Sequence, residues 1–473
     1  MSLPYFQDNS DYQVFLESKR HTVSDSGVMV MPDVVHPKLF DWQRDIVLWA
    51  LKKGQGAIFA DCGLGKTPMQ LEWARLVSRN QDKPVLILAP LAVAPQTVRE
   101  AEKFGIEVQR SAGEVTGRIL VTNYEKLHHF HPSDFSAVVC DESSILKSFD
   151  GTRRTQITEF MRRVPYRLLC TATAAPNDYI ELGTSSECLG NLGYTDMLGR
   201  FFINDQHVIS PMTYRHRGQD LAAVGEKAGW RFKGHAEEAF WRWVCSWARA
   251  LRKPSDIGYD DDGFILPKLT EIETVVKARS KRPDLLFEVM AVGFHEEREV
   301  TRRTINERCE IAAEKVNHTG QPAVIWCHLN DEADTMVKMC PDAEQVSGQD
   351  SDESKESKFE AFRYGKLRVL VIKPKIGAYG LNWQHCAHVV YFVSHSYEQY
   401  YQAVRRCWRF GQTQPVTVDI IRTEAQERVM QNLKRKSDAA DRMFADLVAY
   451  MNNTMKANGH RDFNEEMEVP KWL

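Results

Sequence analysis

The stretch Gly63–Thr67 (GLGKT) has the clearest capacity for chemistry in this chain. The apolar residues Ile58–Ala60 precede it and predict the end of a buried strand, and apolar residues at helical spacing follow it. A strand, a glycine turn and a helix start together make a phosphate cradle, because backbone N–H groups and the helix N-terminus converge on the anion. We expect Lys66 to reach the β and γ phosphates and the Thr67 hydroxyl to ligate Mg²⁺. An ordinary glycine turn between a strand and a helix would show the same local pattern.

An acidic pair, Asp141 and Glu142, directly follows the apolar run Ala137–Cys140. Hydrolysis of a phosphoryl group needs Mg²⁺ held on the nucleotide and an oriented water molecule. We therefore expect Asp141 to coordinate Mg²⁺ through water and Glu142 to orient the attacking water. We also expect the acidic pair and the phosphate loop to end adjacent strands. Any strand can end in an acidic pair, so the assignment depends on the phosphate loop.

A third set of residues could place positive charge next to the γ-phosphate, where negative charge develops during hydrolysis. Gln402, Arg406 and Arg409 would share one face of a helix predicted over Tyr397–Phe410, at positions i, i+4 and i+7. A solvated basic helix face is the alternative. If these groups and Lys66 hold one nucleotide, the site lies between two domains, and hydrolysis is coupled to domain opening.

The elements that position these residues form two α/β halves. Short apolar runs alternate with helical segments in each half, which predicts right-handed crossovers and parallel sheets with chemistry at the strands' C-terminal ends. Charged helices are expected over 295–317 and 424–451. The expected strands are 58–60, Val85–Ala89, Ile119–Thr122, Ala137–Cys140, Arg167–Cys170, Ala323–Cys327, Val369–Ile372, Val389–Val393 and Val416–Ile421.

The segment between the halves has a different pattern. Residues 236–254 (AEEAFWRWVCSWARALRKP) predict one helix with an apolar stripe from Phe240 to Leu251. We interpret the stripe as core-facing, with a solvated basic face. The alternative is a nucleic-acid contact through Trp241, Arg242 and Arg249.

Composition places the chain among ordinary globular proteins. It has 473 residues, of which 43% are hydrophobic and 26% charged. No apolar run approaches the roughly 20 residues that span a bilayer, and the N-terminus lacks signal-peptide features. The 10 cysteines include no CxxC pair, which indicates a reduced, intracellular chain. The net charge of −3 argues against indiscriminate polyanion binding but allows a local basic groove.

The ordered series of stretches over residues 36–435 resembles the motifs of superfamily-two helicase ATPases of the Swi/Snf-like group. DCGLGKTPMQ resembles motif I, CDESSILKS motif II and QAVRRCWRFGQTQPVTV motif VI. LAPLAVAPQTVREAEKF, VTNYEKL and CTATAAPNDYIELG resemble motifs Ia, Ib and III, and VIWCHLNDEADTM and KIGAYGLNWQHC resemble motifs IV and V. The chain departs from the family where motif II reads DESS and where Lys373–Lys375 replaces the usual Ser-Thr-Lys of motif V.

The resemblance implies an α/β fold with two RecA-like parallel-sheet domains in tandem, over 36–183 and 266–435. A mostly helical insertion would occupy 184–265. An N-terminal arm would precede the first domain over 1–35, and a C-terminal helix and tail would follow the second over 436–473.

The resemblance also implies a set of site residues, with ATP and Mg²⁺ as cofactors. Gln43 would read the adenine, and Arg409 would be the arginine finger. The implied catalytic residues are Lys66, Asp141, Glu142, Arg406 and Arg409. The implied nucleotide-binding residues are Gln43, Gly63, Gly65, Lys66, Thr67, Gly380 and Gln402. Thr67 and Asp141 would bind the metal. The implied nucleic-acid contacts are Pro90, Asn123, Thr171, Thr173, His328 and Asn382.

The activity implied is ATP-driven translocation on double-stranded DNA by a minimal bacterial or phage-type member of the family. Such a protein would be cytoplasmic and monomeric, without a membrane partner. Two alternatives stay open: a strand-separating DNA or RNA helicase, and a nucleotide switch that recruits a separate nuclease or other protein subunit.

Overall fold

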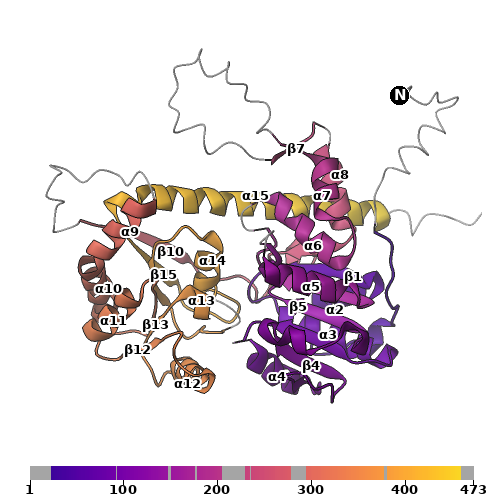
Figure 1. The fold of residues 1–473 in the computed structure, drawn as a ribbon, viewed down its shortest axis with the longest axis horizontal. Helices are drawn as coiled ribbons and strands as arrows, with labels where there is room; N and C mark the ends of the chain where they lie inside the picture. Colours follow the sequence, from indigo (N-terminus) through magenta and orange to yellow (C-terminus); the bar gives the residue numbers. More distant parts are fainter. Residues whose placement is uncertain are drawn as a thin grey trace, which may run out of the picture.

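Two α/β lobes lie side by side in the computed structural model (Figure 1). The structure describes residues 23–91, 93–147, 151–175, 178–204, 230–234, 236–277, 294–377 and 381–459.

Lobe 1 is built on a seven-stranded parallel sheet with the order β3-β4-β2-β5-β6-β1-β9. Alternate residues of β1 and β2 enter two different hydrophobic clusters, so both faces of the sheet are covered. The strands are β1 Gln55–Ala60, β2 Val85–Ala89, β3 Gln109–Arg110, β4 Ile119–Asn123, β5 Ala137–Asp141, β6 Tyr166–Thr171 and β9 Ala248–Leu251. The helices beside them are α2 Asp41–Lys53, α3 Lys66–Asn80, α4 Ala94–Lys103 and α5 Thr152–Arg162.

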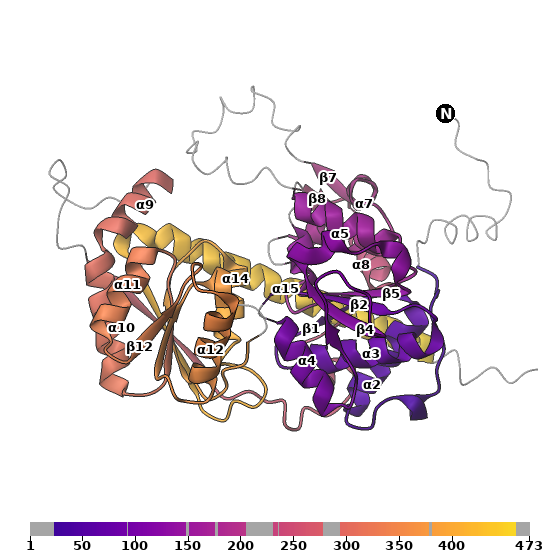
Figure 2. The same cartoon turned by 60° about the horizontal axis from the view of Figure 1, so that its bottom comes forward.

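Lobe 2 has a six-stranded parallel sheet with the order β10-β15-β14-β11-β13-β12, and Figure 2 shows helices on both of its sides. Its strands are β10 Leu269–Val276, β11 Ala323–Trp326, β12 Ala343–Val346, β13 Val369–Ile372, β14 His388–Phe392 and β15 Val416–Thr423. Its helices are α9 Phe294–Arg303, α10 Ile305–Thr319, α11 Asn330–Met339, α12 Asp352–Arg363, α13 Pro374–Gly377 and α14 Tyr397–Val404. The two tandem parallel-sheet domains expected from the sequence are confirmed.

Several expected elements differ in the structure. The helix expected over 236–254 is wrong beyond Cys245: α8 spans Ala236–Cys245, and the chain then enters β9. The backbone at Trp247 and Ala248 joins the sheet instead, since Ala57 N donates to Trp247 O at 2.9 Å and Ala57 pairs with Ala248. The insertion therefore supplies β9 as an edge strand of lobe 1. Burial of this strand beside β1 outweighs the helical spacing of its apolar residues.

Two other expectations need correction. The helix expected over 295–317 is broken between α9 and α10 at Thr304, whose Oγ1 donates to Val300 O at 2.8 Å. The strands that end in the phosphate loop and the acidic pair are not adjacent, because β6 lies between β1 and β5. The described residues between the halves also form α6 Leu182–Leu189, α7 Tyr194–Phe201 and an antiparallel pair, β7 Phe202–Asn204 with β8 Trp230–Phe232.

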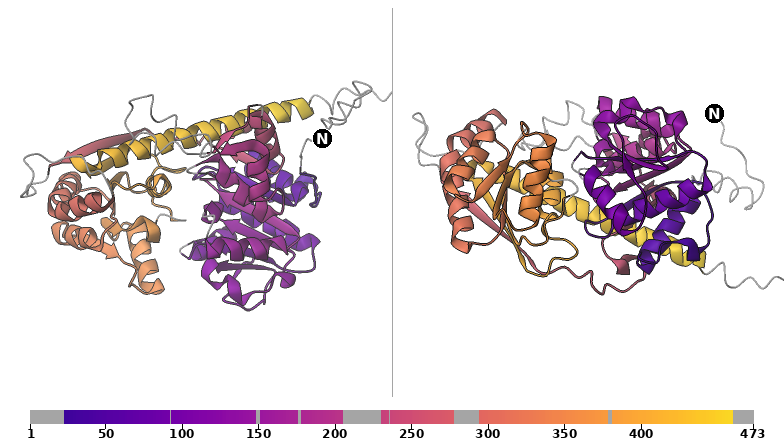
Figure 3. Two further views of the ribbon diagram at one scale, coloured as in Figure 1. Left: turned by 45° about the horizontal axis from the view of Figure 1, so that its top comes forward. Right: turned by 90° about the horizontal axis from the view of Figure 1, so that it is seen from below.

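The last helix, α15 (Glu427–Gly459), leaves lobe 2 and runs along lobe 1, as Figure 3 shows. Its residues Met443, Phe444, Leu447 and Met451 belong to the core cluster of lobe 1. Tyr450 stacks on Trp241 with 6.2 Å between ring centroids. The C-terminal helix thus joins the two lobes through apolar packing. Among the described residues, no helix combines the length and apolar character that crossing a membrane requires.

Candidate active site

The loop between β1 and α3 is shaped by two glycines. Gly63 and Gly65 have φ of 92° and 72°, a region that L side chains rarely adopt. A Cβ on Gly65 would lie 2.4 Å from Gln43 Nε2, and a Cβ on Gly63 would lie 2.7 Å from Phe410 N. Gly63 therefore allows a close approach between the loop of lobe 1 and the backbone of lobe 2.

Lys66 opens α3, and its Nζ donates to the carbonyls of Ala60 (2.9 Å) and Asp61 (3.3 Å). Lys66 and its neighbour Thr67 line a cavity of about 320 Å³. The ammonium is thus held by neutral carbonyls, and its positive charge is available to an anion in the cavity.

Gln43 is held in one orientation next to this loop. Its Oε1 accepts from Phe40 N at 3.1 Å, and its Nε2 donates to Leu64 O at 3.0 Å. One Nε2 hydrogen and one Oε1 lone pair are left, the donor and acceptor pair with which a glutamine reads N7 and N6 of adenine. Four phenylalanine rings line the same cavity. Among them, Phe264 stacks on Phe410 at 4.8 Å and meets Phe40 edge-on at 5.1 Å.

Asp141 ends β5 and is buried. Its Oδ1 accepts from Gln70 Nε2 at 2.7 Å and from Glu142 N at 3.1 Å. Burial, followed by the nearby charge of Glu142, raises the pKa of Asp141 to about 6. A buried carboxylate with a raised pKa is a group that gains from a bound cation.

Glu142 has a positive φ of 54°, unusual for a residue with a side chain. Its Oε2 is buried, with no hydrogen-bond partner among the residues that the structure describes. Glu142 lines the cavity together with Asp141. The strained backbone and the unpaired oxygen fit a carboxylate that holds a water molecule.

The arginines come from the end of α14, and the expected helical face needs correction. The helix ends at Val404, so Arg406 and Arg409 lie in the turns beyond it. Both still converge, because the Nη1 atoms of Arg406 and Arg409 donate to Leu381 O at 2.9 and 3.3 Å. Burial, followed by the charge of Arg406, lowers the pKa of Arg409 to about 10, so the guanidinium stays charged at neutral pH.

Lys66, Thr67, Asp141 and Glu142 of lobe 1 and Arg406 and Arg409 of lobe 2 line one and the same cavity. Gln402 lies behind the cavity wall, where its Oε1 accepts from Arg406 Nη2 at 2.7 Å. Gly380 lies outside the described residues.

The six implied nucleic-acid contacts do not gather at one place. Pro90 and Asn382 line a second cavity between the lobes, of about 570 Å³. The Asn123 side chain accepts from Lys126 N and so caps a 3₁₀ helix. Thr171 Oγ1 accepts from the backbone N–H of the neighbouring Thr173, and both threonines are buried. His328 meets Tyr391 edge-on at 5.5 Å.

Comparison with known proteins supports this arrangement. The model of the "Helicase conserved C-terminal domain" family matches residues 305–411, which include both arginines. The human DNA annealing helicase and endonuclease ZRANB3 is 26% identical over 186 residues, which is 35% of this chain and 17% of the relative. A putative protein p41 of Acyrthosiphon pisum secondary endosymbiont phage 1 is 23% identical over 412 residues, 77% of this chain and 87% of that protein. Arabidopsis thaliana Protein CHROMATIN REMODELING 8 is 30% identical over 120 residues, 24% of this chain and 10% of the relative.

The fold is that of two tandem RecA-like parallel-sheet lobes, and the second lobe carries the match to the helicase C-terminal domain. Residues 305–411 thus match a helicase domain, and the relatives support similarity to superfamily-two helicases of the Swi/Snf-like group. The chain spans only 17% of the length of ZRANB3.

Proposed function

We propose that the protein hydrolyses ATP between its lobes and uses the cycle to move along double-stranded DNA. The observation that carries the proposal is the single cavity lined by Lys66 and Glu142 from one lobe and Arg406 and Arg409 from the other. A triphosphate bound there would touch both lobes, so its hydrolysis would change the forces between them.

In this proposal Gln43 and the aromatic wall hold the base, and the phosphate loop holds the phosphates. The first N–H groups of α3 and the Lys66 ammonium face the negative charge. Thr67 and Asp141 offer a hydroxyl and a carboxylate, the hard oxygen ligands that suit Mg²⁺. Bound Mg²⁺ would neutralise phosphate charge. Asp141 must be ionised for this role.

Glu142 would orient the attacking water with its unpaired Oε2 and accept a proton from it. Arg406 and Arg409 would stabilise the charge that develops on the γ-phosphate, with Arg409 as the finger. Such groups act mainly on the transition state, so their loss is expected to lower kcat more than the affinity for ATP.

The second cavity is where we propose that DNA binds. Its lining includes seven cationic and six acidic side chains, and four of the cations pair with acidic residues of the same lining. The cations are Arg99, Arg110, Lys147, Arg153, Lys355, Arg363 and Lys375. Cations of this kind contact phosphates, so binding is expected to be independent of sequence and weakened by salt. Similarity to ZRANB3, a DNA annealing helicase, supports DNA as the substrate class.

We further propose a monomer that acts in the cytoplasm and is bacterial or phage-encoded. Similarity to the phage protein supports the origin, and the supply of both halves of the cavity by one chain supports the monomer. A nuclease, if one takes part, would be a separate subunit.

The test is the ATPase rate with duplex DNA, single-stranded DNA and RNA. We expect duplex DNA to give the largest stimulation, and Lys66→Ala and Glu142→Gln to abolish it. Lys366→Ala and Glu344→Gln, at exposed positions of lobe 2, are matched controls. A preference for single strands or RNA would favour the strand-separating alternative, and a stoichiometric effect without stimulated turnover would favour the nucleotide switch. If Glu142→Gln hydrolyses ATP as fast as wild type, Glu142 is not the residue that orients the attacking water.

A further inference from the structure

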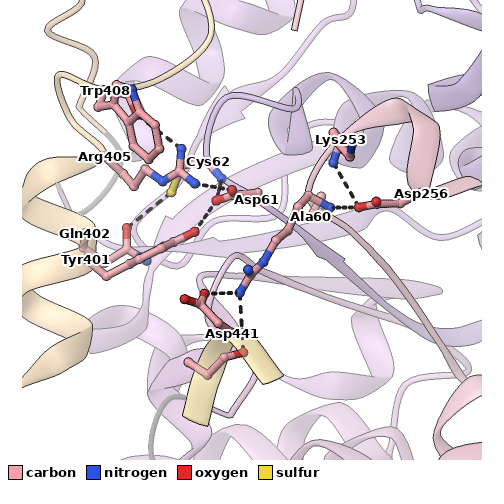
Figure 4. A network of polar contacts seen from close by, with 12 residues as sticks. Ala60, Asp61, Cys62, Lys253, Asp256, Tyr401, Gln402, Arg405, Trp408 and Asp441 are labelled. Carbon is pink, nitrogen blue, oxygen red and sulfur yellow. Dashed lines mark hydrogen bonds and ion pairs between the residues drawn. The ribbon is translucent and has the colours of Figure 1, made fainter. Parts of the chain in front are cut away.

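A second, buried set of polar contacts joins the lobes beside the candidate site (Figure 4). Asp61 follows β1, directly before the phosphate loop. Its Oδ1 accepts from Cys62 N at 2.6 Å and from the Tyr401 hydroxyl, and its Oδ2 accepts from Arg405 Nη2. Tyr401 lies on α14 and Arg405 caps it, so two of these three contacts cross between lobes.

These contacts are buried, unlike an ion pair at the rim of the cleft. The side chains of Asp61 and Arg405 are 6% and 10% exposed, whereas Arg99 and Glu356, which also pair across the lobes, are 40% and 42% exposed. Exposed pairs contribute little, but removing one partner of a buried pair leaves an uncompensated charge. Losing a partner of the Asp61 pair is therefore expected to affect how the lobes meet more than losing a partner of the Arg99 pair.

Neighbouring residues of the loop reinforce the contact. Cys62 Sγ donates to Gln402 Oε1 at 3.8 Å, and Gln402 Oε1 also accepts from Arg406. Gly63 lies directly against the backbone of Phe410. Three successive loop residues thus contact the segment 401–410, which carries both arginines of the cavity.

Arg405 itself has a different environment from the two arginines that follow it. Its guanidinium lies 4.3 Å from the centroid of the Trp408 ring and 5.3 Å from that of Tyr401. Arg405 does not line the cavity, whereas Arg406 and Arg409 do. The chain leaves the helix at Val404, so the direction of Arg406 depends on how the backbone at Arg405 is held.

We propose that Asp61, Tyr401 and Arg405 form an interlobe clamp that positions Arg406 and Arg409 against the phosphate loop. The clamp rests on the proposed ATP hydrolysis for its function, but not for its existence. Its three members are positioning residues, because they act through the loop and through the neighbouring arginines. It would hold the lobes in register before ATP binds, so that Arg406 and Arg409 are already positioned for the γ-phosphate.

The test combines a distance measurement without ATP and steady-state kinetics. Spin labels on Glu102→Cys of lobe 1 and Lys366→Cys of lobe 2 report the distance between lobes, and the ten native cysteines are buried. We expect Arg405→Met and Asp61→Asn each to broaden this distance. Because small misplacements are costly in catalysis, each should lower the DNA-stimulated kcat at least about tenfold while KM for ATP changes less than about threefold.

The double variant Asp61→Asn/Arg405→Met should lose no more than the worse single variant, since a coupled pair is lost only once. Arg368→Met, which breaks a surface pair with Asp342 in the same lobe, is the matched control. Tyr401→Phe removes one hydrogen bond and keeps the ring, which provides a milder variant if Arg405→Met does not fold.

An unchanged distance distribution in Asp61→Asn and Tyr401→Phe would overturn the clamp, as would kinetics equal to those of Arg368→Met. Absence of ATPase activity in the wild type would instead refute the proposed function, and the distance measurement would still decide on the clamp.

Discussion

Replacing Asp141 with asparagine is expected to stabilise the ATP-free protein while it abolishes turnover. Asp141 is buried next to Glu142, and both effects raise its pKa from 3.8 to about 6. The carboxylate therefore costs folding free energy when it is ionised. Asparagine keeps the Oδ1 acceptor used by Gln70 Nε2 and by Glu142 N, and it removes the charge.

The size and sign of the expected change in unfolding free energy follow from proton linkage. One pKa unit corresponds to about 1.4 kcal/mol, so a rise of roughly two units gives a penalty of about 3 kcal/mol as an upper bound. Below about pH 3 the carboxyl of Asp141 is mostly protonated in both the folded and the unfolded chain, and it contributes little. As the pH rises to about 6, the Asp141 carboxyl ionises in the unfolded chain before it ionises in the folded chain. This favours the unfolded state, so the free energy of unfolding of the wild-type protein falls. Above that pH the penalty is complete.

The assay is urea unfolding of wild-type protein and Asp141→Asn at several pH values, without nucleotide. We expect a higher midpoint for Asp141→Asn at pH 7.5, and a difference that shrinks as the pH falls toward about 3. Asp134→Asn, at an exposed position just before β5, is the control and should show no such gain. Equal or lower stability of Asp141→Asn at pH 7.5 would show that burial does not destabilise the carboxylate.

Four further outcomes are expected. Arg409→Ala should lower kcat by about 100-fold or more with little change in the Kd for ATP, because the guanidinium acts on transition-state charge; equal losses in both would contradict this. The kcat/KM for ATP should fall about tenfold between pH 7 and pH 5, since Asp141 must be ionised to hold Mg²⁺ and its pKa is about 6; a flat profile would contradict it. Trp241→Ala should destabilise the fold by about 3–5 kcal/mol and leave DNA affinity unchanged at low temperature, because its side chain is fully buried. Gly63→Ala should impair ATPase activity because the new methyl meets Phe410 N, whereas Gly105→Ala, also at positive φ but with open space around it, should retain activity.

Local patterns in the sequence predicted most of the strands. Val85–Ala89 and Val369–Ile372 are continuous apolar runs, and they are buried strands with the expected bounds. β10 was not predicted, because four of its eight residues are polar or charged and its burial is only partial. The helical stripe after Phe240 was interpreted correctly as core-facing, since Trp243 and Trp247 are buried.

The remaining features depend on contacts between distant parts of the chain. Nothing local shows that Ala248–Leu251 would prefer the edge of β1 to the end of a helix. Arg405 was overlooked because helical spacing selects Arg406 and Arg409, whereas its partner Asp61 lies in the other lobe. An acidic residue directly before a phosphate loop, together with a third arginine in the distant basic segment, was the only available signal.

The most direct test of the account is a crystal structure with Mg²⁺, ADP and aluminium fluoride, a mimic of the transferring γ-phosphate. We predict that the fluoride lies between Lys66 of lobe 1 and Arg409 of lobe 2, with Glu142 facing the water opposite the leaving group. A nucleotide held by lobe 1 alone, with Arg406 and Arg409 directed to a different cavity, would contradict the central claim.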